Sequence, residues 1–132
     1  MHQFRLAVAV RCFRQSLMES LKSARNLNVD GIQFDVRNEV VASELTETGR
    51  KQLLHRISEL GLTIAGTSFP LTRPLTDPQE IDRSVAELRN AMTFAYSLKA
   101  KTLCCKVGRI PEDRDGKPRQ LLLEVLNDLA AH

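Results

Sequence analysis

The sequence is poor in aromatic residues and has no cluster of like charges. Of its 132 residues, five are phenylalanine, one is tyrosine and none is tryptophan. Proteins that bind single-stranded nucleic acid stack bases on aromatic side chains, so such a role has few candidate residues here. Nineteen Lys and Arg residues against sixteen Asp and Glu give a net charge of +3, and the cations never form a run of five. This interspersed charge argues against a nucleic-acid partner.

Long apolar runs and a disulfide framework are missing as well. No apolar run approaches the ~20 residues that span a bilayer, and the first residues lack the basic and apolar regions of a signal peptide. We therefore expect no membrane partner. The three cysteines, Cys12, Cys104 and Cys105, are an odd number and two are adjacent, which is unfavourable for disulfides. They indicate a cytoplasmic location, and we interpret them as thiols of the core.

What the sequence does contain is a regular alternation of strand and helix patterns. A hydrophobic content of 42% is enough for one buried core, so residues 1–132 are expected to form a single domain. Apolar periodicity predicts four strand–helix units with no linker between them. The predicted strands span residues 4–10, 31–36, 62–69 and 101–107.

The predicted helices carry start and stop signals. Ser16 and Glu19 have the spacing of a capping box at the start of the first helix. Asp77 and Pro78 supply a cap oxygen and a first-position proline for the third helix, which is predicted to reach about residue 98. The remaining signals are Thr46 and Pro118 as helix starts and Gly61 as a left-handed helix stop.

The connections between the predicted strands are long enough for right-handed helical crossovers between parallel strands. Two architectures accept this pattern. One is an open, doubly wound sheet with helices on both faces; the other is part of an eight-stranded barrel with helices only on the outside.

The alternation of side chains along the strands favours the barrel. Ile32 and Phe34, for example, alternate with Gln33 and Asp35. An open sheet would bury the charged side chains under helices, at a cost of several kcal/mol per unpaired charge. We therefore predict an α/β fold, a parallel (βα)4 sheet that is the N-terminal half of a TIM (β/α)8 barrel. An open sheet remains the alternative, because polar residues are ordinary where strands end. On the third strand the predicted polar face holds Thr63, Ala65 and Thr67.

Polar side chains gather at the predicted carboxyl ends of the strands, where barrel active sites form. Four of them are cations, which would bind carboxylate or phosphate oxygens, and one is an aspartate, which would accept hydrogen bonds from hydroxyls. A structural alternative is that Asp35 pairs with Arg37 or Arg11 and tethers loops. The predicted substrate-binding residues are Arg11, Gln33, Asp35, Arg37, Ser68, Lys106 and Arg109.

The residues alone indicate no metal site and no catalytic residue. The three histidines are far apart in the predicted fold and are expected at the surface. Cys104 and Cys105 point to opposite faces of one strand, so they cannot share one ion. Ser68 has no histidine or lysine placed to activate it. The histidines are His2, His55 and His132.

Four segments together are typical of one family. They are Gly31-Ile32-Gln33-Phe34-Asp35-Val36-Arg37, Leu45-Thr46-Glu47-Thr48-Gly49-Arg50 with Leu53-Leu54, Ser68-Phe69-Pro70, and Val107-Gly108-Arg109-Ile110-Pro111-Glu112-Asp113. The chain resembles the xylose isomerase-like TIM-barrel family, in its branch of sugar phosphate isomerases and epimerases. The resemblance covers the first four of that family's eight strand–helix units.

The resemblance implies a barrel enzyme that binds a divalent metal (Mn²⁺, Mg²⁺, Co²⁺ or Zn²⁺) and interconverts sugars or sugar phosphates by a proton or hydride shift. In that family the metal ligands, two glutamates with an aspartate and a histidine, lie on strands five to eight. None of them is carried over to a residue of this chain, so we expect the chain alone to be inactive.

The alternative function is a non-catalytic half-barrel module that binds a small anionic or polyhydroxylated ligand. In either case two strand edges stay unpaired, which predicts a partner. We favour the C-terminal half of a longer protein over a second copy of the chain as that partner.

Overall fold

A computed structural model describes residues 4–132 and contains a parallel four-stranded sheet in the order β1-β2-β3-β4. The strands are β1 (Ala7–Ala9), β2 (Gly31–Asp35), β3 (Thr63–Ser68) and β4 (Leu103–Cys104). The helices are α1 (Leu17–Asn26), α2 (Glu47–Glu59), α3 (Ile81–Ser97) and α4 (Lys117–Ala130). Two short 3₁₀ helices, η1 (Val10–Phe13) and η2 (Ala42–Glu44), follow β1 and β2.

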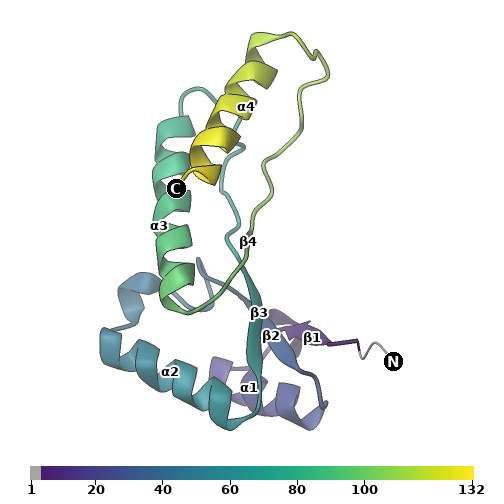
Figure 1. The fold of residues 1–132 in the computed structure, drawn as a ribbon, viewed down its shortest axis with the longest axis vertical. Coiled ribbons are helices and arrows are strands. Elements are labelled where there is room, and N and C mark those ends of the chain that lie inside the picture. Colours follow the sequence, from purple (N-terminus) through teal and green to yellow (C-terminus); the bar gives the residue numbers. More distant parts are fainter. Residues whose placement is uncertain (1–3) are drawn as a thin grey trace.

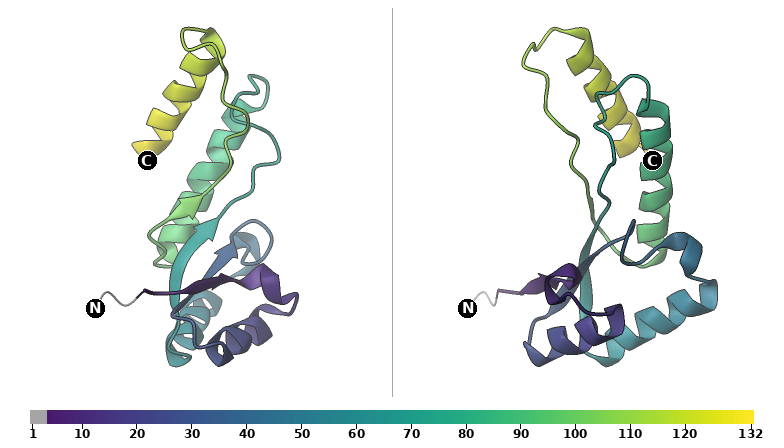
Figure 2. Two further views of the ribbon diagram at one scale, coloured as in Figure 1. Left: turned by 90° about the vertical axis from the view of Figure 1, so that its right-hand side faces the viewer. Right: turned by 180° about the vertical axis from the view of Figure 1, so that it is seen from behind.

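Each strand pairs in parallel with the next strand along the chain, as in a barrel and unlike a doubly wound sheet. The strand direction rotates strongly from β1 to β4 (Figure 2). The described helices lie along the lower, left-hand and upper sides of the strands in Figure 1, and none lies to their right. The structure thus confirms the predicted half of a TIM barrel, with one face of the sheet covered by helices.

The core lies between the outer face of the sheet and the helices. Ile32 and Phe34 on β2 are fully buried, and they belong to the same apolar cluster as Leu21 of α1, Leu53 of α2 and Leu88 of α3. A parallel sheet needs this cover, because its side chains on the packed face are removed from water.

Most of the predicted helix boundaries are confirmed. Ser16 and Glu19 form a capping box, in which the Glu19 amide donates to the Ser16 hydroxyl at 3.4 Å and the Ser16 amide donates to the Glu19 carboxylate at 3.3 Å. Thr46 Oγ1 accepts a hydrogen bond from the amide of Gly49 at 3.0 Å. Gly61 has a φ of 70°, as expected of a left-handed helix stop.

The predicted start of the third helix is wrong. Asp77 Oδ1 accepts a hydrogen bond from the amide of Gln79 at 3.1 Å, which caps a turn, and α3 begins only at Ile81. A short aspartate side chain stabilises such a turn as readily as a helix start, so the sequence pattern did not separate the two.

The outer strands are shorter than predicted. The first pairs over Ala7–Ala9 and the fourth over Leu103–Cys104, against predicted spans of 4–10 and 101–107. Each is an edge of the sheet and pairs with only one neighbour in the described chain. The first ladder ends at Ala9 because the chain enters η1 at Val10, and the last ladder ends at Cys104, opposite the final residue of β3.

A β-bulge in β3 corrects the predicted faces of that strand. Ile32 pairs with Ile64, but Gln33 pairs with Gly66, so Ala65 is the extra residue. The bulge shifts the alternation by one residue. Thr67 therefore lies beside Phe34, fully buried on the helix-covered face, whereas it was predicted on the polar face.

Candidate functional site

A cavity of about 460 Å³ lies at the carboxyl ends of the strands. Five of the seven predicted substrate-binding residues line it: Arg11, Gln33, Asp35, Ser68 and Lys106. The other lining residues are Phe69, Pro70, Leu71, Cys104 and Cys105. The remaining two predicted residues, Arg37 and Arg109, lie outside it.

The register of the sheet places three of the lining side chains in one row. Asp35 pairs with Ser68, and Ser68 pairs with Cys104, so the three share one face at the ends of β2, β3 and β4. The bulge at Ala65 is what brings Ser68 to this face. Arg11 comes from η1, directly after β1, and Lys106 lies two residues beyond β4.

Asp35 holds the loop after β2. Its Oδ1 accepts hydrogen bonds from the amides of Arg37 at 2.6 Å and Asn38 at 3.2 Å, and its Oδ2 accepts one from the Asn38 side-chain amide at 2.8 Å. The carboxylate is nearly buried, and none of the ion pairs within residues 4–132 involves it. The predicted ion pair of Asp35 with Arg37 or Arg11 is therefore wrong. Asp35 does tether a loop, as predicted, but through hydrogen bonds from the Arg37 and Asn38 backbone amides and from the Asn38 side chain.

Arg37 turns away from the cavity and joins β2 to α3. Its Nη2 lies 2.6 Å from Oε2 of Glu87, and its guanidinium lies 4.2 Å from the centre of the Phe69 ring. Because Phe69 lines the cavity, Arg37 supports the wall of the site without facing it.

The Arg37–Glu87 pair predicts a pH dependence of stability. The hydrogen bond and charge of Arg37, with a further contribution from Arg83, hold the pKa of Glu87 below its ordinary value of 4.5. A carboxyl with a lowered pKa in the folded state stabilises the fold above its unfolded pKa, and this contribution is lost as the pH falls through the folded pKa.

We expect Glu87→Gln to lower the free energy of unfolding by about 1 kcal/mol at pH 7, and by less at pH 3, because the contribution is lost as the pH falls below the ordinary pKa of 4.5 and through the lowered folded-state pKa. Urea unfolding at the two pH values measures this difference. Glu112→Gln, which changes an exposed carboxylate, is the matched control. An equal loss at both pH values would contradict the assignment.

Arg109 lies in the loop between β4 and α4. Its side chain is 86% exposed and pairs with Glu112, three residues further along the same loop. Nothing in the described chain brings it to the other predicted residues, because the loop extends away from the sheet (Figure 1).

The cysteines correct one prediction, and the described histidines confirm another. Cys12 and Cys104 are exposed and only Cys105 is half-buried, so the interpretation of all three as core thiols is wrong. It failed because Cys104 lies on the cavity face of the sheet and Cys12 in an exposed 3₁₀ turn. His55 is at the surface beside Glu59, and His132 is exposed, whereas His2 lies outside the described residues.

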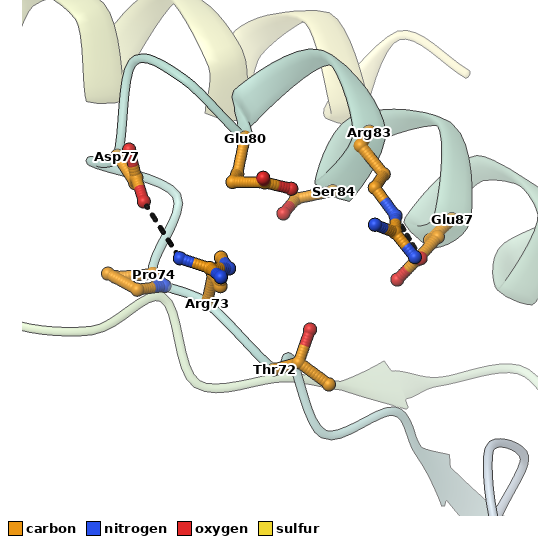
Figure 3. A pocket seen from close by; sticks show the side chains of 8 residues that line it. All are labelled: Thr72, Arg73, Pro74, Asp77, Glu80, Arg83, Ser84 and Glu87. Carbon is orange, nitrogen blue, oxygen red and sulfur yellow. Dashed lines mark hydrogen bonds and ion pairs between the residues drawn. The ribbon is translucent and has the colours of Figure 1, made fainter.

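A second cavity, of about 540 Å³, lies between the loop at residues 72–80 and the first turns of α3 (Figure 3). None of the predicted site residues lines it. Its cations are already paired with its carboxylates: Arg73 lies 3.8 Å from Asp77, and Arg83 lies 3.3 Å from Glu87. The first cavity is therefore better suited to a charged ligand, because its two cations, Arg11 and Lys106, form no such pairs within residues 4–132.

Comparison with protein families decides where the chain belongs. The model of the xylose isomerase-like TIM barrel family matches residues 21–132. The chain belongs to this family. The family includes sugar isomerases and epimerases, and the match confirms the resemblance noted above at the level of the family. No curated protein matches the sequence.

Solved structures share the family fold. The xylose isomerase domain protein from Planctomyces limnophilus aligns with a TM-score of 0.74 at 16% identity, over 98% of this chain and 48% of that chain. A fusion protein of a xylose isomerase-like TIM barrel and a 4-hydroxyphenylpyruvate dioxygenase aligns with a TM-score of 0.73 at 16% identity, over 99% of this chain and 20% of that chain. The family member described here thus spans about half the length of the first of these proteins.

Members of the family often bind a metal, and the described residues do not provide a site for one. Within residues 4–132, no three His, Cys, Asp or Glu side chains lie together as metal ligands. The Asp35 carboxylate at the cavity is occupied by hydrogen bonds from Arg37 and Asn38. In the same part of the chain, no helix is long and apolar enough to cross a membrane.

Proposed function

We propose that this chain is the substrate-binding half of a metal-dependent sugar or sugar phosphate isomerase or epimerase. The observation that carries the proposal is the cavity at the carboxyl ends of the strands, where two cations and two uncharged polar side chains come together. In TIM barrels the active site forms at this end, because the loops that follow the strands meet there.

The lining residues match the chemistry of a phosphorylated sugar. Arg11 and Lys106 would bind the phosphate, since both side chains are exposed and unpaired in the described chain. Gln33 and Ser68 would exchange hydrogen bonds with sugar hydroxyls. Asp35 would act as a positioning residue for the loop rather than as a ligand-binding one, because its oxygens already accept three hydrogen bonds.

In this proposal the metal ligands and the groups that move the proton belong to the other half of the barrel. The chain covers 48% of the Planctomyces limnophilus protein, which leaves about half of that protein's length without a counterpart in residues 1–132. We therefore propose that residues 1–132 alone turn over no sugar. We also propose a cytoplasmic location, which the free cysteines favour.

The open sides of the half barrel would receive that partner. Phe4 and Leu6 are exposed next to β1, and Leu123 and Leu126 are exposed on α4, which packs against α3. Exposed apolar side chains near the β1 edge and on the last helix fit a further set of strand–helix units that closes the barrel. We propose the C-terminal half of the barrel as this partner, ahead of a second copy of the chain.

Ligand-induced stabilisation of the 132-residue chain tests the binding part of the proposal. We expect sugar phosphates to raise the unfolding temperature, with a gain of about 2.7 kcal/mol in the free energy of unfolding at a ligand concentration 100 times Kd. The matching uncharged sugars and inorganic phosphate serve as controls. Equal stabilisation by inorganic phosphate and by sugar phosphate would contradict recognition of the sugar.

The second candidate is a binding module without catalysis. It is favoured by one observation, namely that the described residues hold a cavity with ligand-binding groups but no cluster of metal ligands. Addition of Mn²⁺ and sugar phosphate to a complex of the chain with the other half of the barrel separates the two candidates. Turnover supports the enzyme; saturable binding without turnover supports the module.

A further inference from the structure

We propose that the second cavity, between the loop at residues 72–80 and the first turns of α3, binds an uncharged polyhydroxylated molecule such as a sugar. The second cavity shares no lining residue with the first cavity, at the carboxyl ends of the strands. The inference therefore does not rest on the function proposed above, and each can fail without the other.

The loop that forms one wall of the second cavity is fixed by its own contacts. Leu75 is fully buried, and its amide donates a hydrogen bond to the carbonyl of Val107 at 3.1 Å. Pro74 lies so close to Gly108 that a Cβ added at Gly108 would be 2.6 Å from the Pro74 Cβ. The opposite wall is the start of the regular helix α3 (Figure 3). The cavity, of about 540 Å³, is thus preformed and has the size of a small-molecule site.

Ser84 is the side chain that points to a ligand. It lines the second cavity and is only 6% exposed. Figure 3 shows it on the side of α3 that faces the loop, with Thr72 and Arg73 opposite. Within residues 4–132 its hydroxyl takes part in no hydrogen bond. Because an unpartnered polar group at a buried position costs free energy, a ligand that satisfies this hydroxyl gains affinity.

Two further side chains of the second cavity keep hydrogen-bonding capacity. The Glu80 carboxylate joins none of the ion pairs of the described chain and does not cap α3. Arg73 Nη1 lies 3.8 Å from Asp77 Oδ2, which is an ion pair but is too long for a hydrogen bond. The cavity thus offers acceptors at Glu80, donors at Arg73, and a hydroxyl at Ser84 that can do either.

The balance of charge around the second cavity indicates an uncharged ligand. Two guanidinium groups line it beside three carboxylates, and Arg37 binds one of these carboxylates, that of Glu87, from outside the cavity. A cationic ligand would meet Arg73 and Arg83, and an anionic ligand would meet the carboxylates. A hydroxyl group donates to a carboxylate and accepts from a guanidinium without the cost of burying a further charge. Neighbouring hydroxyls on one carbon skeleton therefore match both kinds of group.

Three sugars with the same ring and different charge test the proposal on the purified chain. They are glucose, which is uncharged, glucosamine, which is cationic at slightly acidic pH, and glucuronate, which is anionic. NMR of the isotope-labelled chain at constant ionic strength gives the affinity and the amides that respond. We expect glucose to shift the amide signals of Arg73 and Ser84 saturably, with a Kd of about 1 mM. Each charged sugar should bind about threefold or more weakly.

Ser84→Ala is the discriminating variant. The hydroxyl has no partner in the described chain and alanine is the better helix former, so we expect a urea midpoint no lower than that of the wild type. The same variant should bind glucose about threefold or more weakly, and Glu80→Gln should weaken binding to a similar extent. The matched controls Ser58→Ala and Glu124→Gln change exposed side chains of α2 and α4, and should leave the affinity within about twofold.

Four results would overturn the proposal. They are the absence of a saturable shift at Arg73 and Ser84, tighter binding of either charged sugar, equal glucose affinities of Ser84→Ala and Ser58→Ala, and a lowered urea midpoint of Ser84→Ala, which would assign the hydroxyl to the fold. Shifts at Gln33 instead of Ser84 would place glucose in the first cavity, which contradicts this inference and leaves the proposed function standing. If Arg11→Gln and Lys106→Gln together abolish binding of sugar phosphate but leave the glucose shift at Ser84 unchanged, the two sites are separate as proposed.

Discussion

Replacement of Arg11 and Lys106 by glutamine together is expected to weaken the binding of a sugar phosphate by about 100-fold or more. Each cation lines the cavity, and a hydrogen bond to a charged group contributes about 1.5 kcal/mol or more, which is about a tenfold change in affinity per residue. Glutamine keeps a polar side chain, although a shorter one, and removes the charge. Isothermal calorimetry measures the change in affinity. The ionic strength is kept constant, because salt screens the attraction between exposed charges and a charged ligand.

Arg109→Gln is the matched control for this double variant. Arg109 is a cation from the loop that follows β4, but its side chain points to solvent beside Glu112 and does not line the cavity. We expect its substitution to change the affinity by less than about twofold. Loss of affinity by Arg109→Gln to the same extent would show that the net charge of the chain, rather than the cavity, attracts the ligand. Urea midpoints close to that of the wild type would show that the variants fold.

The strand–helix order and the half-barrel architecture were predictable from the sequence. The reason lies in strand β2, where Ile32 and Phe34 alternate with Gln33 and Asp35, and the structure buries the first pair under helices and leaves Gln33 at the cavity. Helix signals with two reciprocal partners, such as Ser16 and Glu19, were also reliable. The signal at Asp77 was not reliable, because the same side chain stabilises a turn.

The site was predictable in part, and the failures have local causes. A bulge inserts one residue into a strand, so every later side chain points to the opposite face from the one that simple alternation predicts. For this reason the predicted face of Thr67 was wrong. Ser68 was assigned to the site only because it lies at the end of a strand. Arg37 was assigned to the site because it follows β2, but its partner Glu87 is 50 residues away in the sequence. Local pattern contains no information on such a contact. Cys104 was missed because cysteine is usually a core residue, although its predicted alternation with Cys105 already placed only one of the two on the core face.

The second large effect concerns Phe34, the side chain that joins the sheet to its helices. It is fully buried on β2 next to Thr67, so Phe34→Ala removes a large apolar group and leaves a cavity between the sheet and the helices. We expect a loss of about 3–5 kcal/mol in the free energy of unfolding, measured by urea at neutral pH. Because that loss can equal the whole stability of a small domain, Ile32→Val is measured beside it, with an expected loss of about 0.5–1.5 kcal/mol.

Phe4→Ala is the control for Phe34→Ala, because it makes the same substitution at a side chain that is 88% exposed. We expect it to change the free energy of unfolding by less than about 0.5 kcal/mol.

An open sheet covered on both faces would bury the cavity face as well, so Gln33→Ala would then also lower the free energy of unfolding. In the half barrel Gln33 faces the cavity and its substitution should be nearly neutral for stability. A loss at Gln33 similar to that at Phe34 would contradict a sheet with one covered face.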